Sequence, residues 1–120
     1  SASDPSHPLF NGLPQSFEIE DETYLMEVFE DSVTPLARSS FDYSDRSTYS
    51  LALAMTGERR SNRGWSRPPG SNVVVWTRQA GNSPLVYIQP GHDAKTFGNR
   101  HYRQLVLNSL DWVISQGDMW

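Results

Sequence analysis

The chain contains no cysteine, which excludes disulfides, thiolate metal sites and a cysteine nucleophile. It has no apolar run close to the about 20 residues that a membrane-spanning helix needs, so we predict no membrane segment. It also lacks an excess of basic charge, with 10 lysines and arginines against 14 aspartates and glutamates. This balance disfavours binding to the phosphate backbone of nucleic acids. The cellular compartment stays open: the cytoplasm is favoured, with the periplasm and secretion as alternatives.

Hydrophobic residues are scarce as well. They make up 37% of the 120 residues, whereas roughly 45–50% is typical of globular domains on a count that includes glycine and omits tyrosine. The length is sufficient for one domain. We therefore interpret residues 1–120 as a single domain that is either rich in loops or a piece of a larger fold.

The first third of the chain predicts only short elements. Residues 1–16 hold prolines and small polar residues that are typical of turns. Residues 17–20 alternate apolar and acidic side chains, which predicts a half-buried strand. Residues 24–29 could form a helical face or a second extended run, and we favour strand and turn. A further short strand is predicted at 33–41, although Pro35 weakens it.

Residues 42–71 break the pattern, apart from a short apolar run at 51–55. A connection of this length is usually functional or disordered. Trp65 stands inside it and has two interpretations: it anchors the loop to the body of the protein, or it belongs to a flap over a pocket. The connection also holds a cluster of basic residues, interpreted as a solvated loop: Arg59, Arg60, Arg63 and Arg67.

The clearest pattern lies in the last fifty residues. A β-branched run at 73–77, turn residues at 81–82 and a second apolar run at 84–89 predict a β-hairpin. After a polar loop, Asn99 is a suitable N-cap for a helix from Arg100 to about Ser115. The predicted apolar stripe and C-terminal stop of this helix are Tyr102, Leu105, Val106, Leu110, Val113 and Gly117.

The second strand of the hairpin leads into Gly91, His92 and Asp93. Glycine permits a sharp turn, and in open α/β sheets ligands bind beyond the carboxyl ends of the strands. His92 is therefore a candidate acid/base group or metal ligand, with hydrogen bonding to the loop backbone as the alternative. Asp93 could orient the imidazole ring, act as an acid/base group itself, or cap the loop.

A run of acidic residues precedes the hairpin. If the segment is extended, Glu18, Glu20 and Glu22 share one face, which is more typical of a solvated surface than of a site. Asp21 and Tyr24 need a separate explanation that the local pattern does not provide.

Familiar catalytic motifs do not occur. The sequence has no GxSxG, P-loop, GxGxxG or HExxH motif, so a classical hydrolase triad has no support. His7, His92 and His101 are too far apart in sequence to define a three-histidine metal site. His101 lies on the polar flank of the predicted helix and is interpreted as ordinary surface.

Several of these pieces together resemble a known family. "HPLFNGLP", "SFEIEDETY" and "VVVWTRQAGNSPLVYIQPGHDAKTFGNRHYRQLVLNSLDWV" follow one another in the order of the ThuA-like (trehalose utilisation) family. The resemblance implies a class I glutamine amidotransferase-like fold, that is, a flavodoxin-like, doubly wound α/β sheet. The chain resembles only the C-terminal half of that fold. An open sheet edge invites pairing, so we expect either a homo-oligomer or a missing N-terminal half.

The resemblance also implies a role in the metabolism of trehalose or a related disaccharide. It gives a metabolic neighbourhood rather than a reaction, so acid/base or metal-assisted chemistry and a non-catalytic carbohydrate-binding or interaction module both stay open. A small-molecule carbohydrate is the expected ligand, and a divalent metal is a candidate cofactor. The polar residues that match by position are His7, Asp21, Glu22, Tyr24, Gln89, His92 and Asp93.

From this set we expect His92, Asp93 and Glu22 to be catalytic, with His92 also the candidate metal ligand. The residues expected to contact the substrate are Asp21, Tyr24, Gln89 and Trp65. Tyr24 and Trp76 could form a wall against a sugar ring, although packing in the core is the more usual role of aromatic side chains on strands.

Overall fold

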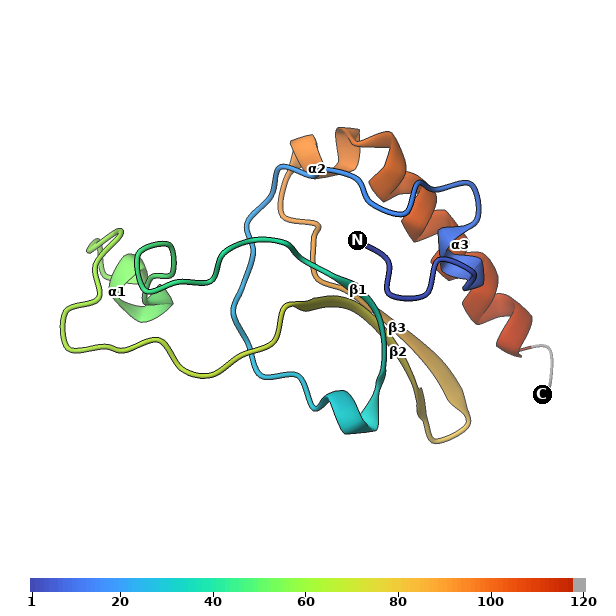
Figure 1. The fold of residues 1–120 in the computed structure, drawn as a ribbon, viewed down its shortest axis with the longest axis horizontal. Helices are drawn as coiled ribbons and strands as arrows, with labels where there is room; N and C mark the ends of the chain where they lie inside the picture. Colours follow the sequence, from blue (N-terminus) through green and yellow to red (C-terminus); the bar gives the residue numbers. More distant parts are fainter. Residues whose placement is uncertain (118–120) are drawn as a thin grey trace.

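A computed structural model of the protein describes residues 1–117 and contains one antiparallel sheet of order β1-β2-β3 (Figure 1). β1 spans Thr34–Arg38, β2 spans Val73–Ala80 and β3 spans Ser83–Ile88. The β2–β3 register is regular from Val75↔Ile88 to Ala80↔Ser83. The predicted hairpin is confirmed, and the short strand predicted at 33–41 is confirmed within narrower bounds.

The sheet confirms only part of the predicted fold class. The protein is α/β, with a hairpin and a C-terminal helix as expected. Every strand pair within residues 1–117 is antiparallel, whereas a flavodoxin-like sheet is doubly wound and parallel. The flavodoxin-like sheet implied by the resemblance is therefore not what these residues form among themselves.

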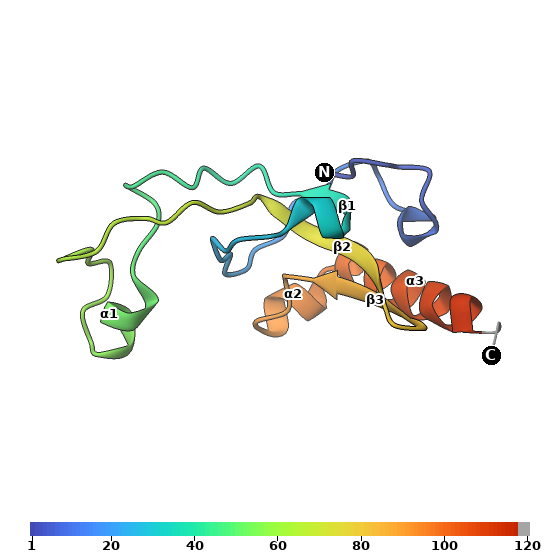
Figure 2. The same cartoon turned by 90° about the horizontal axis from the view of Figure 1, so that it is seen from below.

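Helix α3, Arg100–Gly117, covers one face of the sheet and also contacts the short helix η1, Pro8–Phe10 (Figures 1 and 2). The Asn99 side chain caps α3 as predicted, because its Oδ1 accepts hydrogen bonds from the backbone N–H groups of His101 and Tyr102. The core between sheet and helix consists of Leu9, Phe10, Leu36, Ala37, Val75 and Leu105.

The predicted apolar stripe of α3 is only partly buried. Tyr102 and Leu105 are buried, but Leu110 is 56% exposed. The helix also continues beyond Ser115 to Gly117. Gly117 is the residue predicted to end the helix, and residues 118–120 after it lie outside the described part of the chain.

Two strand predictions in the N-terminal part are wrong. Residues 17–20 are extended but pair with no strand, because the Glu18 and Glu20 carbonyls accept hydrogen bonds from side chains instead. Residues 24–29 contribute a single bridge, Met26↔Ser71, and lead into the short helix η2, Glu30–Ser32. Alternation of apolar and polar residues predicts exposure correctly, but a strand also needs a neighbouring backbone.

The long connection, residues 42–71, forms an arm that projects from the body and carries α1, Leu51–Met55, near its tip (Figures 1 and 2). The arm is held together by its own polar contacts: Asn62 accepts from Ser50 N and donates to the Thr48 carbonyl. Trp65 is partly buried within it. Across the described residues, no helix is long and apolar enough to cross a membrane.

Candidate functional site

The segment 18–24 lies along residues 89–99, and side chains rather than strand pairing hold the two together. We call this contact the seam. At one end, Gln89 brackets the backbone of Tyr24: its Oε1 accepts from Tyr24 N at 3.1 Å and its Nε2 donates to the Tyr24 carbonyl at 3.2 Å. The Thr23 hydroxyl donates to the same Oε1 at 3.0 Å. Gln89 therefore positions the 18–24 segment where β3 ends.

Asp21 forms the centre of the seam. Its Oδ2 accepts from the backbone N–H of Gly91 at 2.7 Å and of His92 at 3.4 Å. The pKa of Asp21 lies below its ordinary value: partial burial raises it, but the hydrogen bonds it accepts, led by that of Gly91, lower it by more in total. The carboxylate is thus a backbone anchor for the loop that presents His92.

The other end of the seam is fixed by the residues that begin the two C-terminal helices. Thr96, which is fully buried, donates to the Glu20 carbonyl at 3.4 Å, and the Asn99 amide donates to the Glu18 carbonyl at 2.8 Å. Lys95 reaches the Glu20 carboxylate at 2.5 Å, but both side chains are mostly exposed. An exposed ion pair of this kind contributes little to stability.

Gly91 allows the turn that places His92. Its φ is +146°, a conformation that side chains rarely adopt, and a Cβ there would lie 2.9 Å from the Tyr102 hydroxyl. That hydroxyl donates to the Pro90 carbonyl at 3.0 Å. Burial, and secondarily the charge of Asp21, raise the pKa of Tyr102, which keeps it a hydrogen-bond donor.

The seam brings His92 and Glu22 together. His92 Nδ1 lies 3.6 Å from Glu22 Oε2, and the two side chains are 52% and 57% exposed. The Tyr24 hydroxyl donates to the same Oε2 at 2.7 Å. This hydrogen bond, with lesser contributions from burial and acidic neighbours, raises the pKa of Tyr24. Three polar side chains predicted from the sequence, separated by up to seventy positions, therefore form one cluster.

Asp93 has a different position. Its Oδ1 accepts from the backbone N–H groups of Lys95 at 2.8 Å and Thr96 at 3.3 Å. These contacts cap a short helix, α2, spanning Ala94–Gly98, where the sequence predicts a polar loop. Of the three roles considered for Asp93, the geometry corresponds to the cap.

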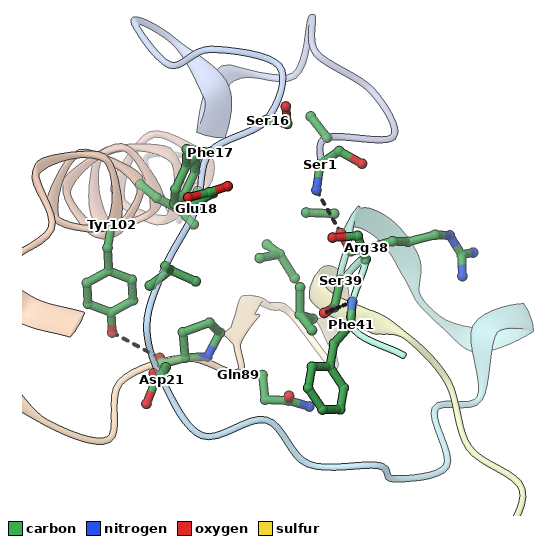
Figure 3. A pocket seen from close by; sticks show the side chains of 18 of the residues that line it. Ser1, Ser16, Phe17, Glu18, Asp21, Arg38, Ser39, Phe41, Gln89 and Tyr102 are labelled. Atoms are coloured by element: carbon green, nitrogen blue, oxygen red, sulfur yellow. Dashed lines mark hydrogen bonds between the residues drawn. The ribbon is translucent and has the colours of Figure 1, made fainter. Parts of the chain in front are cut away.

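A cavity of about 600 Å³ adjoins the cluster (Figure 3). One wall is the extended segment 14–23, the opposite wall is residues 37–41, and β2 and Leu105 provide an apolar floor. Gln89 and Phe41 lie near each other on its lower side in Figure 3. Glu22 lines the cavity and also contacts His92. The cavity and the polar cluster thus share the residue Glu22.

The donor set for a metal is limited. Within residues 1–117, no three His, Asp or Glu side chains are arranged to hold a metal ion. His92 and Glu22 supply two ligands at most. The other histidines lie elsewhere: the His101 ring packs 5.3 Å from the Phe17 ring, and His7 lies 5.5 Å from Trp112.

His7 caps η1, since its Nδ1 accepts from Leu9 N at 3.2 Å. Burial lowers the pKa of His7, and the attraction of Asp4 offsets this only in part. His7, which the family resemblance marks as a candidate site residue, therefore has a structural role as a neutral imidazole.

The two tryptophans considered for substrate contact do not join the cluster. Trp65 belongs to the arm, and none of residues 42–71 lines the cavity, so the flap interpretation finds no support. Trp76 stacks on Tyr87 with ring centroids 5.0 Å apart rather than forming a wall with Tyr24.

Sequence reasoning missed three residues that hold the site in place: Thr23, Thr96 and Tyr102. The Thr23 hydroxyl bonds to Gln89 and also to the Tyr43 hydroxyl, the Thr96 hydroxyl donates to the Glu20 carbonyl, and the Tyr102 hydroxyl donates across the turn to Pro90. Their neighbours in sequence are mostly polar or charged, so no local pattern pointed to these partners.

Comparison with known proteins gives one match. A family model described as "ThuA: Trehalose utilisation" matches residues 1–113, nearly the whole chain. No curated protein and no solved structure matches significantly. The matched range includes every residue of the seam and of the cluster around Glu22. The chain belongs to the ThuA family.

Proposed function

We propose that this ThuA protein performs general acid/base chemistry on a sugar or sugar derivative bound in the cavity beside Glu22. The observation that carries the proposal is the position of Glu22, which is one of the residues that line the cavity and whose Oε2 lies 3.6 Å from His92 Nδ1. A bound substrate would therefore lie next to a carboxylate–imidazole pair. Trehalose or a related disaccharide is the substrate class that the family description supports.

Each member of the cluster has a distinct part in the proposed chemistry. Glu22 holds the Nδ1 side of the imidazole, which leaves His92 Nε2 to accept or donate a proton. The Tyr24 hydroxyl bonds to the same carboxylate oxygen and fixes its orientation. Asp21 and Gln89 are positioning residues, because their polar atoms are occupied by the backbone of the seam.

The same residues give less support to metal-assisted chemistry. His92 and Glu22 provide two ligands, whereas catalytic zinc sites usually have three from the protein. A divalent ion would need its remaining ligands from substrate and water. Proton transfer by the imidazole needs no additional group from the protein.

The test is turnover of a panel of disaccharides, including trehalose, by the wild-type protein and by His92→Ala and Glu22→Gln variants. General acid/base groups contribute about 10²–10⁴-fold in rate, so each variant is expected to lose activity on that scale. Glu27→Gln is the matched control, because Glu27 is exposed on the same acidic stretch and lies outside the cavity lining. Full turnover by both site variants would refute the proposal.

A carbohydrate-binding module without catalysis is the second candidate, and the cavity itself favours it, since its aromatic and aliphatic lining suits the apolar faces of a sugar ring. Calorimetry separates the two. Sugar binding without turnover in the wild type, unchanged by His92→Ala, would favour the binding module. Trp65→Ala is expected to leave binding in the cavity unchanged, because the arm does not line it.

A further inference from the structure

Tyr43, at the base of the arm, contacts residues of both long walls of the cavity, although it is not itself a lining residue. Its ring packs edge to face against the ring of Phe41, with centroids 5.1 Å apart and planes at 72°. Its hydroxyl lies 2.5 Å from the Thr23 hydroxyl oxygen. Phe41 and Thr23 belong to opposite walls. One partly buried side chain therefore joins the two segments.

The directions of the hydrogen bonds around Thr23 follow from counting protons. A threonine hydroxyl has one proton, and that of Thr23 is donated to Gln89 Oε1 at 3.0 Å. The Tyr43 hydroxyl is therefore the donor in its bond with Thr23. The Gln89 amide continues the chain, because its two polar atoms bond to the backbone N–H and carbonyl of Tyr24. We call this series of bonds, from Tyr43 through Thr23 and Gln89 to Tyr24, the Tyr43 relay.

The relay ends at the polar cluster of the site. The Tyr24 hydroxyl donates to Glu22 Oε2 at 2.7 Å, and this oxygen lies 3.6 Å from His92 Nδ1. Residues 21–24 belong to no helix or strand, so bonds from side chains hold them in place of a backbone ladder. Bonds in series also polarise and strengthen one another. The position of the Glu22 carboxylate therefore depends on each bond of the relay.

We propose that Tyr43 is a positioning residue for the acid/base pair of Glu22 and His92. This inference rests on the proposed function, because it assigns to Tyr43 a part in the same chemistry. Tyr43 acts through Thr23 and Gln89, since it neither lines the cavity nor bonds to the pair. Displacing a reacting group by about 1 Å can cost about 10²-fold in rate. We expect the loss of one relay bond to shift the carboxylate by less.

The test is steady-state kinetics on the disaccharides that the wild type turns over. Tyr43→Phe removes only the hydroxyl and keeps the ring on Phe41. It is expected to lower kcat about tenfold, below the about 10²–10⁴-fold of a removed acid/base group. KM should stay within about twofold, because the residues that line the cavity are unchanged. Circular dichroism and urea denaturation check that the variant is folded.

Variants of Thr23 separate a relay from two independent contacts. Thr23→Val is isosteric without the hydroxyl and is expected to lose kcat to the same extent as Tyr43→Phe. The double variant should lose no more, because both substitutions break the same series of bonds. Thr23→Ser keeps a hydroxyl at this position and is expected to restore kcat.

Tyr49→Phe is the matched control. Tyr49 is also a tyrosine of the arm, but its hydroxyl donates to the Arg46 carbonyl at 3.0 Å within the arm itself. This variant is expected to have the kcat of the wild type.

A second readout needs no turnover. The bond to Glu22, with burial and the charges of Glu22 and Asp21, raises the pKa of Tyr24 above its ordinary 10.0. If the relay holds Tyr24 in place, Tyr43→Phe should return this pKa towards 10.0, whereas Tyr49→Phe should leave it unchanged. Carbon NMR of labelled tyrosine measures the titration, and the Tyr24→Phe spectrum assigns the signal.

The outcomes distinguish this inference from the proposed function. Full turnover by His92→Ala and Glu22→Gln refutes the acid/base chemistry, and the Tyr24 titration then decides whether the relay positions the cluster. Wild-type kcat in Tyr43→Phe, beside an inactive His92→Ala, overturns the inference, as does an unchanged pKa of Tyr24. A higher KM at unchanged kcat would show that Tyr43 only closes the cavity. An equal loss in Tyr49→Phe would show a general loosening of the arm, and either result also overturns it.

Discussion

Replacing Gly91 by alanine tests whether the turn that presents His92 depends on a missing side chain. Two penalties follow from the structure. At φ +146° an alanine is strained by about 1–3 kcal/mol. Its Cβ would also lie 2.9 Å from the Tyr102 hydroxyl, which must move and weaken its hydrogen bond to the Pro90 carbonyl, at about 1 kcal/mol. The expected loss in free energy of unfolding is about 2–4 kcal/mol.

Urea denaturation of Gly91→Ala, with an unchanged m-value, measures this loss. A Tyr102→Phe background separates the two penalties. Without the hydroxyl the contact disappears and the backbone strain remains, so a double-mutant cycle is expected to show a coupling of about 1 kcal/mol. Gly98→Ala is the control, since a Cβ at Gly98 meets nothing within 4 Å. Wild-type stability of Gly91→Ala would show that the reasoning about this turn is wrong.

Three further predictions concern the residues around the site. Asp21 has a folded pKa below its ordinary 3.8, so its contribution to stability is present above about pH 4 and is lost as the pH falls through the folded pKa. Asp21→Asn is therefore expected to weaken the fall in unfolding free energy at acid pH. An unchanged acid dependence in this variant would contradict the role of Asp21. His7 has a folded pKa below 6.5, so its protonation lowers stability as the pH falls below about 6.5. NMR titration of the imidazole should give a pKa under 6.5, and a pKa above 6.5 would refute the capping role. Asn99→Ala removes both a helix cap and the link to the Glu18 carbonyl and is expected to cost about 1–2 kcal/mol in thermal or urea unfolding. Lys95→Ala should cost nearly nothing, and equal effects of the two variants would contradict the conclusion that hydrogen bonds from side chains to the backbone, rather than the exposed ion pair, hold the seam.

The elements that could be predicted are those specified by neighbours in sequence. The hairpin follows from a β-branched run, a second apolar run and a Gly81–Asn82 turn between them, and α3 follows from helical spacing behind the Asn99 cap. Each depends on interactions within a few residues, so composition and spacing are sufficient. The strand predicted at 17–20 is wrong for the converse reason, since a strand requires a partner that lies elsewhere in the chain.

The candidate site shows the same division. The types of its residues were visible in the sequence: an imidazole after a strand, carboxylates in an acidic run, a tyrosine beside them. The role that each of these residues has in the structure was not visible in the sequence. Asp21 and Asp93 read alike as acidic candidates, yet Asp21 anchors the loop through Gly91 N and Asp93 caps α2. A carboxylate finds its hydrogen-bond donors through the path of the whole chain.

By itself, then, the sequence determined the hairpin, the last helix, the membership of the ThuA family and the identity of the polar residues near the site. Only the tertiary structure decided that Glu22 meets His92 beside a cavity, and that the hairpin is joined to β1 in one sheet. The physical reason is range. Propensity and periodicity act over a few residues, whereas the contact of Glu22 with His92 and the pairing of β1 with β2 are formed by segments that the chain brings together from up to seventy positions apart.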